Sequence, residues 1–436
     1  MNFVQRDKEV IWHPFTPQKG SSDVIPIERA EGVWLYTSDG RKIIDAISSW
    51  WVNIHGHAHP YIAKKIAEQA LKLEQVIFAG FTHTPAIILA EQLLKILPGN
   101  LSKVFYSDDG STAVEVALKM ALQYWHNKGE KKIKIIAFEN AYHGDTFGAM
   151  SAGARSQFTA AFQNLLFEVE HIPVPHADNL DECKALIAKL GRRENVTAFI
   201  FEPLVQGAAG MIMHEAKHLD ELIAIAKENK IICIADEVMT GFGRTGRLFA
   251  CDYLENKPDI VCVSKGITGG FLPLGVTACN EKIFEAFDTD DRTKTFFHGH
   301  SYTANPLSCA AAIASLELLL QSECVQQIRM IEDRHAAFVS SLQGNPFVKD
   351  ARYRGTILAV ELNTKEDSSY FNSIRDHIYQ TCLSKGVLLR PLGNVMYCMP
   401  PYCIQAFDLK LIYETISTCL NQVKTCHEKA FHDFSS

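Results

Sequence analysis

Two ionisable side chains end apolar runs that have the length of buried strands. Asp236 ends the run IICIAD and Lys265 ends the run IVCVSK. A buried carboxylate needs a positive partner, either a cationic ring nitrogen of a ligand or an arginine of the protein. A buried lysine has a lowered pKa suited to Schiff-base chemistry, unless its side chain reaches back to solvent. Asp236 and Lys265 are therefore the candidate catalytic residues.

The stretch DDGST, which precedes a helical pattern, is a candidate anion site. Gly110, Ser111 and Thr112 would direct backbone N–H groups and hydroxyls at a phosphate, helped by the positive end of the helix. The alternative is that Ser111 or Thr112 only caps the helix. The sequence contains no P-loop pattern, and no G-x-G-x-x-G directly follows a strand-like run. Nucleoside triphosphates and dinucleotides are therefore disfavoured as ligands.

An anion site, a buried aspartate and a buried lysine at neighbouring strand ends are the set that pyridoxal 5'-phosphate (PLP) requires. In open parallel sheets, ligands bind at the carboxyl ends of the strands, where these residues would meet. The anion site would hold the phosphate, and the carboxylate would keep the pyridine nitrogen protonated. The lysine would bond the aldehyde carbon and then move protons. The residues thus predict PLP as the cofactor.

Two histidine-rich stretches raise the question of a metal, and we expect none. In HGHAHP, the residues His55, His57 and His59 alternate, with no cysteine or acidic residue close by in sequence. A glycine-containing turn with polar rings is favoured over a metal site there. The stretch FFHGHSYTANP reads as a loop that leads into a helix near Asn305, suited to an anion or to a partner subunit.

The composition is that of a globular protein, with 47% hydrophobic and 21% charged residues. A net charge of -7 argues against nucleic acid as a partner. The 12 cysteines form no C-x-x-C pair, which favours free thiols in a reducing compartment. No apolar run reaches the roughly 18 residues of a membrane helix, and no signal peptide is visible. We therefore expect a cytoplasmic protein without a membrane partner.

The elements that must position the candidate residues alternate between strands and helices. Strands that are apolar along their whole length and separated by helices indicate an α/β fold with a parallel sheet covered on both faces. In the C-terminal third, ILAVELN and GVLLRPLGNVMYCMPPY predict strands of a separate, smaller sheet. We expect a large domain over residues 51–310. Residues 1–50 and 311–436 would together form a smaller α+β domain.

Several motifs together resemble those of the class III aminotransferases, which are fold-type I PLP enzymes. These motifs are ADEVMTGFGRTG, SKGITGGFLPLG, YHGDTFGAMS and FEPLVQG. The resemblance extends from Trp12 to about Tyr402. SSWWVNIHGHAHP, FYSDDGSTAVEVALKMALQYW and LRPLGNVMYCMPPY resemble the branch that aminates 8-amino-7-oxononanoate in biotin biosynthesis. Alternatives are a class III aminotransferase acting on a diamine or ω-amino acid, and an α/β binding protein without activity.

The resemblance implies roles for individual residues and a homodimer whose active sites lie at the subunit interface. Arg390 is suited to the substrate carboxylate, and Arg244 lies in a loop near the substrate. The loop of Gly299, His300 and Ser301 would reach the phosphate and substrate of the neighbouring subunit. The implied cofactor-binding residues are Gly110, Ser111, Tyr142, Glu202, Asp236, Val238, Lys265, His300 and Ser301. The implied substrate-binding residues are Phe15, Trp50, Tyr142, Lys265, Gly299 and Arg390.

Two departures from the family pattern bear on function. His300 and Ser301 stand where relatives usually carry Pro-Thr, and Ser301 keeps the hydroxyl for a phosphate oxygen. Phe15 stands where relatives that use S-adenosylmethionine typically carry Tyr. It keeps the ring face for stacking and lacks the hydroxyl. S-adenosylmethionine is the favoured amino donor, with lysine the alternative. The apolar segment IWHPFTP, which contains Phe15, is expected to fold over the mouth of the active site.

Overall fold

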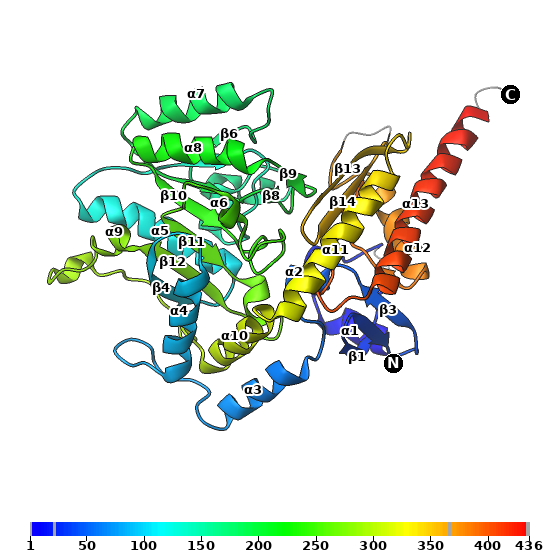
Figure 1. Cartoon of the computed structure of the whole chain (residues 1–436), viewed down its shortest axis with the longest axis horizontal. Helices are drawn as coiled ribbons and strands as arrows, with labels where there is room; N and C mark the ends of the chain where they lie inside the picture. Colours follow the sequence, from blue (N-terminus) through cyan, green and yellow to red (C-terminus); the bar gives the residue numbers. More distant parts are fainter. Residues whose placement is uncertain (1, 21–22, 365–367, 433–436) are drawn as a thin grey trace.

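A seven-stranded sheet forms the centre of the larger part of the molecule (Figure 1). The computed structural model describes residues 2–20, 23–364 and 368–432, with side chains described as far as Gln422. The order of the strands is β4-β12-β11-β10-β7-β5-β6. Their bounds are β4 Leu101–Ser107, β5 Lys134–Phe138, β6 Val169–Ile172, β7 Val196–Phe201, β10 Ile232–Asp236, β11 Ile260–Val263 and β12 Gly275–Asn280.

The sheet is mostly parallel, as the apolar runs predict, with one exception. The pairs β5–β6, β5–β7, β7–β10 and β10–β11 are parallel, whereas β12 pairs antiparallel with both β11 and β4. The predicted strands do not include β12, whose residues are GVTACN. Its reversed direction brings the segment between Lys265 and Gly275 back along the edge where the other strands end.

Alternation along each strand explains why helices cover both faces. In β10, Ile232 and Ile234 pack into the same apolar cluster as α5 (Gly110–Asn127). Cys233 and Ala235 face the opposite cluster, which includes residues of α7 (Leu180–Gly191) and α8 (Ala216–Glu228). A strand buried on both faces reads as a continuous apolar run, and for this reason these strands were visible in the sequence.

The smaller part of the molecule contains two sheets where the sequence predicted one. One sheet has the order β13-β14-β16 and the other β1-β2-β3-β15. The predicted strand run 386–402 divides between them, since β15 pairs with β3 and β16 pairs with β14. The bounds are β1 Ile27–Glu31, β2 Trp34–Thr37, β3 Lys42–Asp45, β13 Val348–Arg354, β14 Ile357–Leu362, β15 Val387–Leu388 and β16 Val395–Cys398; a two-stranded hairpin, β8 Val205–Gln206 and β9 Ile212–Met213, lies elsewhere.

The parallel pairing of β3 with β15 joins the beginning of the chain to its C-terminal third. Figure 1 shows the N-terminal strands beside α12 and α13, on the opposite side from the large sheet. This placement supports the proposed grouping of residues 1–50 with 311–436, whose exact boundaries stay a prediction.

The remaining helices complete the fold. The α-helices are α1 Phe3–Val10, α2 Ser48–Trp51, α3 Pro60–Ala70, α4 Thr84–Ile96, α6 Phe147–Ala152, α9 Glu281–Phe284, α10 Pro306–Leu319, α11 Ser322–Ser341, α12 Ile374–Ser384 and α13 Ala406–His432. The 3-10 helices are η1 Ala160–Leu165, η2 Ala250–Tyr253, η3 Lys265–Thr268 and η4 Arg292–Lys294.

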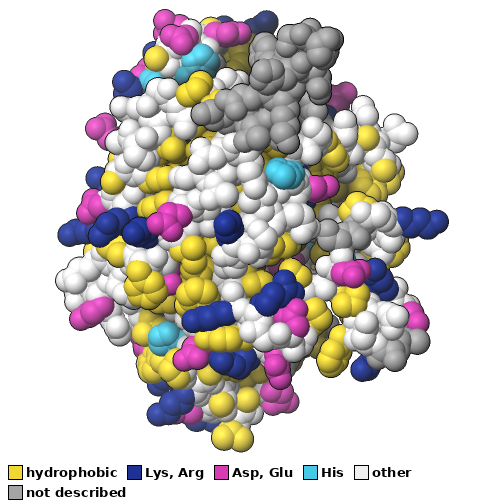
Figure 2. Space-filling view, turned by 90° about the vertical axis from the view of Figure 1, so that its right-hand side faces the viewer, with side chains coloured by type: hydrophobic (Ala, Val, Ile, Leu, Met, Phe, Trp, Pro, Cys, Tyr) yellow, Lys and Arg dark blue, Asp and Glu magenta, His cyan; other side chains and the backbone are white. Residues whose placement is uncertain are grey.

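The surface and the helices bear on the expected partners. In Figure 2, basic, acidic and apolar side chains are interspersed on the face shown, with no basic stripe across it. Within the described part of the chain, no single helix has the length and apolarity to cross a membrane. Only α10 and α11 taken together, a pair bent by 71°, pass that test by length and composition.

Glu237, next to the end of β10, ties this strand to η2. Its Oε1 accepts a hydrogen bond from the N–H of Cys251 at 2.7 Å, and its Oε2 accepts from the N–H of Ala250 at 3.1 Å and from the Thr240 hydroxyl at 2.5 Å. The side chain is fully buried, and this burial raises the pKa of Glu237 to about 7. Glu237 therefore fixes the turn that follows Asp236.

We expect Glu237→Ala to destabilise the protein by about 2–4 kcal/mol, because two buried backbone N–H groups lose their acceptor. Thermal unfolding of the variant should begin several degrees below that of the wild type. The matched control is Glu285→Ala, since Glu285 is exposed and a substitution there should change stability by less than about 0.5 kcal/mol. Equal melting temperatures for the two variants would contradict the role of Glu237.

Candidate active site

Four neighbouring strands deliver polar residues to one cavity. β11, β10, β7 and β5 lie side by side in the sheet. The cavity beyond their carboxyl ends has a volume of ≈ 390 Å³, within the range typical of sites for small molecules and cofactors. Lys265, Asp236, Glu202 and Tyr142 line it, together with the first residues of α5. The structure therefore brings the two predicted catalytic residues into one site.

Lys265 follows β11 and begins η3 with a left-handed backbone, φ 45°. Its Nζ lies 4.6 Å from the centre of the Trp51 ring, and both residues line the cavity. Removal from water lowers the pKa of Lys265 to about 8, an effect that the charges of Asp236 and Glu202 partly offset. A substantial fraction of this amine is therefore unprotonated in mildly alkaline solution, as its predicted role requires.

Asp236 has a partner that was not predicted from the sequence. Nδ1 of His143 lies 2.7 Å from Oδ2 of Asp236, and Oδ1 accepts a hydrogen bond from the N–H of Val238 at 3.1 Å. Both side chains are buried. The signal was present in the sequence, because His143 follows the strand run KIIAF at the same edge of the sheet. Among the described residues, Nε2 of His143 has no hydrogen-bond partner.

The N-terminus of α5 has the geometry of an anion site. Asp109 caps the helix, accepting from the N–H of Thr112 at 2.8 Å, so neither Ser111 nor Thr112 is the N-cap. Gly110 and Ser111 line the cavity, and first-turn N–H groups have no acceptor within a helix. A Cβ atom on Gly110 would lie 2.5 Å from Cγ1 of Val238, so only glycine leaves this approach open.

Glu202 and Tyr142 are coupled beside the cavity. Oε1 of Glu202 accepts from the N–H of Tyr142 at 3.0 Å, and Oε2 accepts from the N–H of Gly207 at 2.9 Å. Burial raises the pKa of Glu202 to about 7, and the nearby His143 partly offsets this shift. Burial also raises the pKa of Tyr142, so this phenol stays protonated at neutral pH. Glu202 therefore holds the backbone from which the Tyr142 ring projects.

A strained segment places Trp51 at the cavity and Trp50 beside it. Ser48, Ser49 and Trp51 all have positive φ angles, between 52° and 68°. Such backbone persists only where its surroundings hold it. Buried Asp45 does so, accepting from the N–H of Ser49 at 2.6 Å.

Two of the three histidines of HGHAHP have structural partners. Nε2 of His57 lies 2.8 Å from Oδ2 of Asp45, and Nε2 of His55 lies 2.9 Å from the carbonyl oxygen of Ser315. Burial lowers the pKa of His55 to about 3, so this ring is neutral. Arg244 is also buried, and its guanidinium donates to the carbonyl oxygens of Pro400 at 2.9 Å and Trp51 at 3.3 Å. Arg244 thus supports the tryptophan segment through its backbone.

Three predicted substrate residues lie together beside the cavity rather than on its floor. The Phe15 ring lies 5.5 Å from the Trp50 ring, and the guanidinium of Arg390 lies 4.9 Å from the centre of the Trp50 ring. Phe15 and Trp50 are both about two-fifths exposed, at 45% and 41%. The segment IWHPFTP thus brings Phe15 against Trp50, next to the tryptophan that lines the cavity.

The loop of Gly299, His300 and Ser301 does not line the cavity of its own chain. Its backbone is held by Gln75, whose Nε2 donates to the carbonyl oxygen of Ser301 at 2.7 Å. Nδ1 of His300 lies 3.2 Å from Oδ2 of Asp108, which does line the cavity. His300 therefore lies near the rim of the anion site, next to Asp108, which is the first of the two aspartates in DDGST.

The residues present fit PLP. The open N–H groups of α5 suit a phosphate, the Asp236 carboxylate held by His143 suits a protonated ring nitrogen, and Lys265 supplies an amine of lowered pKa. Gly110 leaves the N-terminus of α5 accessible, and the cavity volume agrees with a group of this size. No cluster of metal-ligating side chains occurs among the residues that the structure describes.

Comparison with known proteins places these features in a family. The family model for aminotransferase class III matches residues 16–420. The adenosylmethionine-8-amino-7-oxononanoate aminotransferase of Synechococcus elongatus is 50% identical, over 95% of this chain and 99% of its own length. The crystal structure of the enzyme of that name from Methanocaldococcus jannaschii is 37% identical with a TM-score of 0.92, covering 96% of this chain and 98% of that one.

A more distant structure supports the fold alone. The omega transaminase from Pseudomonas jessenii is 24% identical, has a TM-score of 0.92, and covers 98% of this chain and 99% of that one. The predicted α/β architecture of fold-type I, with its large mostly parallel sheet and smaller second part, is confirmed. The match to the family model along nearly all of the sequence shows that this chain belongs to the class III aminotransferases.

Proposed function

We propose that this enzyme transfers an amino group to the ketone of 8-amino-7-oxononanoate, giving 7,8-diaminononanoate in biotin biosynthesis. The observation that carries the proposal is the near full-length match, at 50% identity, to a relative named for this reaction. The cavity supports it, because the polar residues that transamination needs lie together at the strand ends.

PLP, when bound, supplies a ring that withdraws electrons from the carbon to which the amino group is attached. The chain provides the rest. The Asp236 carboxylate, kept in place by His143, would hold a proton on the ring nitrogen. Nζ of Lys265 would take the proton from the substrate carbon and return it, since its pKa lies near 8. The Tyr142 ring would border the cofactor on one side.

Arg390 is the proposed receptor for the carboxylate at the far end of the keto acid. Its guanidinium packs on Trp50, and among the described residues no carboxylate forms an ion pair with it. Arginine binds carboxylates in a bidentate manner with good geometry. A free guanidinium beside an apolar ring suits a substrate with a methylene chain and a terminal charge.

S-adenosylmethionine is the proposed amino donor, because the relatives named above carry this donor in their names. Phe15, which lacks the hydroxyl of the usual tyrosine, keeps lysine as the competing candidate. The two donors differ in size, since one carries an adenine ring and the other a short aliphatic chain. Direct comparison of both is therefore the relevant measurement.

We also propose a cytoplasmic homodimer with active sites at its interface. Several large apolar side chains are exposed, two of them within two residues of the loop of Gly299–Ser301 in sequence, and such side chains favour a covered surface. Every cysteine whose side chain is described is a free thiol, which agrees with a reducing compartment. The exposed side chains concerned are Leu71, Ile77, Phe81, Phe297 and Tyr302.

Steady-state kinetics with different acceptors test the reaction. We expect kcat/KM for 8-amino-7-oxononanoate to exceed that for 2-oxoglutarate or pyruvate by about 100-fold or more, because only the former has a long methylene chain between its ketone and the carboxylate that Arg390 would bind. Lys265→Ala should reduce kcat by about 1,000-fold or more, whereas the exposed-lysine control Lys282→Ala should not. A preference for 2-oxoglutarate or pyruvate would favour another class III activity, and substantial turnover by Lys265→Ala would exclude the proposed role of this lysine.

Phe15→Tyr tests the amino donor. The variant restores the hydroxyl, so we expect the ratio of kcat/KM for S-adenosylmethionine over lysine to rise several-fold. The measurement is the single-turnover conversion of the PLP form by each donor, followed by absorbance. Phe407→Tyr is the control, because Phe407 is exposed at the start of α13. If the ratio is the same in both variants, the hydroxyl does not discriminate between donors.

Mixed dimers test whether the loop acts across the interface. We expect Lys265→Ala and Ser301→Glu each to be inactive, the second because a carboxylate would repel the phosphate. If the loop serves the neighbouring subunit, a hybrid of the two chains has one intact site, and mixing restores about a quarter of wild-type activity. No recovery in hybrids verified by mass spectrometry would place the loop in its own chain's site.

A further inference from the structure

Three aromatic rings beyond the predicted pocket residues continue the surface that begins at Phe15. Phe158 lies in the segment between α6 and η1, and its ring is 6.2 Å from that of Phe15. Tyr370 and Phe371, which precede α12, lie 5.0 and 5.4 Å from Phe158. We propose that Phe158, Tyr370 and Phe371 form an apolar wall that covers the methylene chain of the keto acid and so determines specificity. The proposal rests on the proposed function.

The wall is exposed where a ligand could cover it. Phe158 is 43% exposed and Phe371 is 55% exposed, and Phe158 adjoins the similarly exposed Phe15. Adjoining exposed aromatic rings are unfavourable in water, and such a patch marks a binding surface. Phe15 connects this surface to the cavity, because its ring packs against Trp50, the neighbour in sequence of the cavity residue Trp51.

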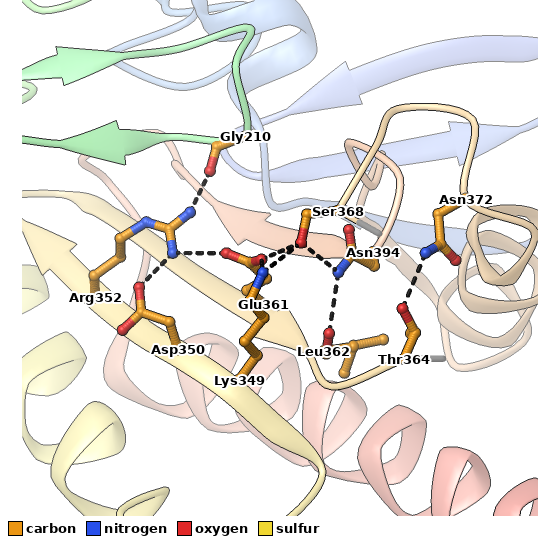
Figure 3. Close-up of polar contacts among 10 residues, drawn as sticks. All are labelled: Gly210, Lys349, Asp350, Arg352, Glu361, Leu362, Thr364, Ser368, Asn372 and Asn394. Carbon is orange, nitrogen blue, oxygen red and sulfur yellow. Dashed lines mark hydrogen bonds and ion pairs between the residues drawn. The ribbon is translucent and has the colours of Figure 1, made fainter. Parts of the chain in front are cut away.

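A network of polar contacts holds the segment that carries two of these rings (Figure 3). The hydroxyl of Ser368 donates to Glu361 and accepts from Lys349 at 2.8 Å. Nδ2 of Asn394 donates to the carbonyl oxygen of Leu362 at 3.0 Å and to the Ser368 hydroxyl at 3.3 Å. Glu361 is itself held by Arg352, which reaches the carbonyl oxygen of Gly210 from the other part of the molecule.

Gly393 fixes the same segment by close packing. It has φ 66°, and a Cβ atom there would lie 1.6 Å from the carbonyl oxygen of Ser369 and 3.0 Å from Cα of Tyr370. No side chain fits without displacing this backbone. Gly393 and Asn394 belong to the turn that begins just after Arg390. The connection between β15 and β16 therefore contains the proposed carboxylate receptor as well as the turn that packs against the segment of the two rings.

Two guanidinium groups favour a carboxylate at this surface. Besides Arg390 on Trp50, the guanidinium of Arg375 lies 4.9 Å from the centre of the Tyr370 ring. Arg375 is partly offset by Asp376, at 3.2 Å, whereas Arg390 has no such partner among the described residues. Two guanidinium groups next to apolar rings attract the carboxylate at the end of an aliphatic chain.

The experiment compares Phe371→Ala with the exposed-ring control Phe407→Ala, using the PLP-loaded enzyme. We expect the KM for 8-amino-7-oxononanoate to rise about tenfold in Phe371→Ala and to stay unchanged in the control, with kcat altered by less than twofold in both. The donor half-reaction, measured by absorbance, should keep its rate constants. Phe371→Leu should recover most of the affinity, because it retains apolar area.

Two further measurements separate binding from positioning. With the short acceptor 4-oxopentanoate, which has a ketone and a carboxylate but few methylenes, Phe371→Ala should change KM by less than twofold. Gly393→Ala should raise the KM for the long keto acid as Phe371→Ala does, and Ser368→Ala gives the same test if Gly393→Ala fails to fold. An unchanged KM in Phe371→Ala, or equal changes for both acceptors and the donor, overturns the wall while leaving the proposed function intact. A wild type that does not aminate the long keto acid overturns both.

Discussion

The parallel pairing of β10 with β11 is the constraint on which the site depends. Asp236 lies opposite Cys262 in this register, and three residues later the chain reaches Lys265 at the same edge. A slip by one residue would turn each side chain to the other face of the sheet. The carboxylate and the amine would then no longer share a cavity, so the apolar contacts of both sheet faces also maintain the chemistry.

The buried charge of Asp236 organises its neighbours in turn. His143, delivered by β5, makes the charge tolerable, and Glu202, delivered by β7, holds the backbone next to that histidine. The strands β11, β10, β7 and β5 are adjacent, so the residues at their ends lie side by side and form one site. The floor of the site is therefore rigid. Its mouth is built differently, from an N-terminal segment and turns of the smaller sheets.

The floor could be predicted from the sequence because its signals are local. Asp236 and Lys265 end uninterrupted apolar runs, and the DDGST stretch precedes a clear helical pattern. The role of His143 was not predicted, because a single histidine after a strand is compatible with many structural roles. Asp109 was not predicted as the N-cap, because Ser111 and Thr112 are also residue types that cap helices. Tertiary context decided the first, whereas a local hydrogen bond decided the second.

The mouth could not be predicted in the same way, since its contacts join residues far apart in the chain. The Phe158–Phe371 contact has no periodic signature, and neither does the packing of Ser369 against Gly393. The predicted single smaller sheet was wrong because β15 and β16 are separated only by a turn, yet pair with different partners. Resemblance to a family identified Phe15, Trp50 and Arg390, which the residues alone would not have done.

The antiparallel strand β12 has a consequence for how the protein is made. β4 starts at Leu101, but its partner in the sheet begins only at Gly275. A ribosome adds about 5–20 residues per second, so β4 and the helix that follows it wait on the order of ten seconds for that partner. During this interval one edge of the nascent sheet is open and apolar. The last strand to enter the large sheet thus also ends the period in which the new chain is most exposed to aggregation.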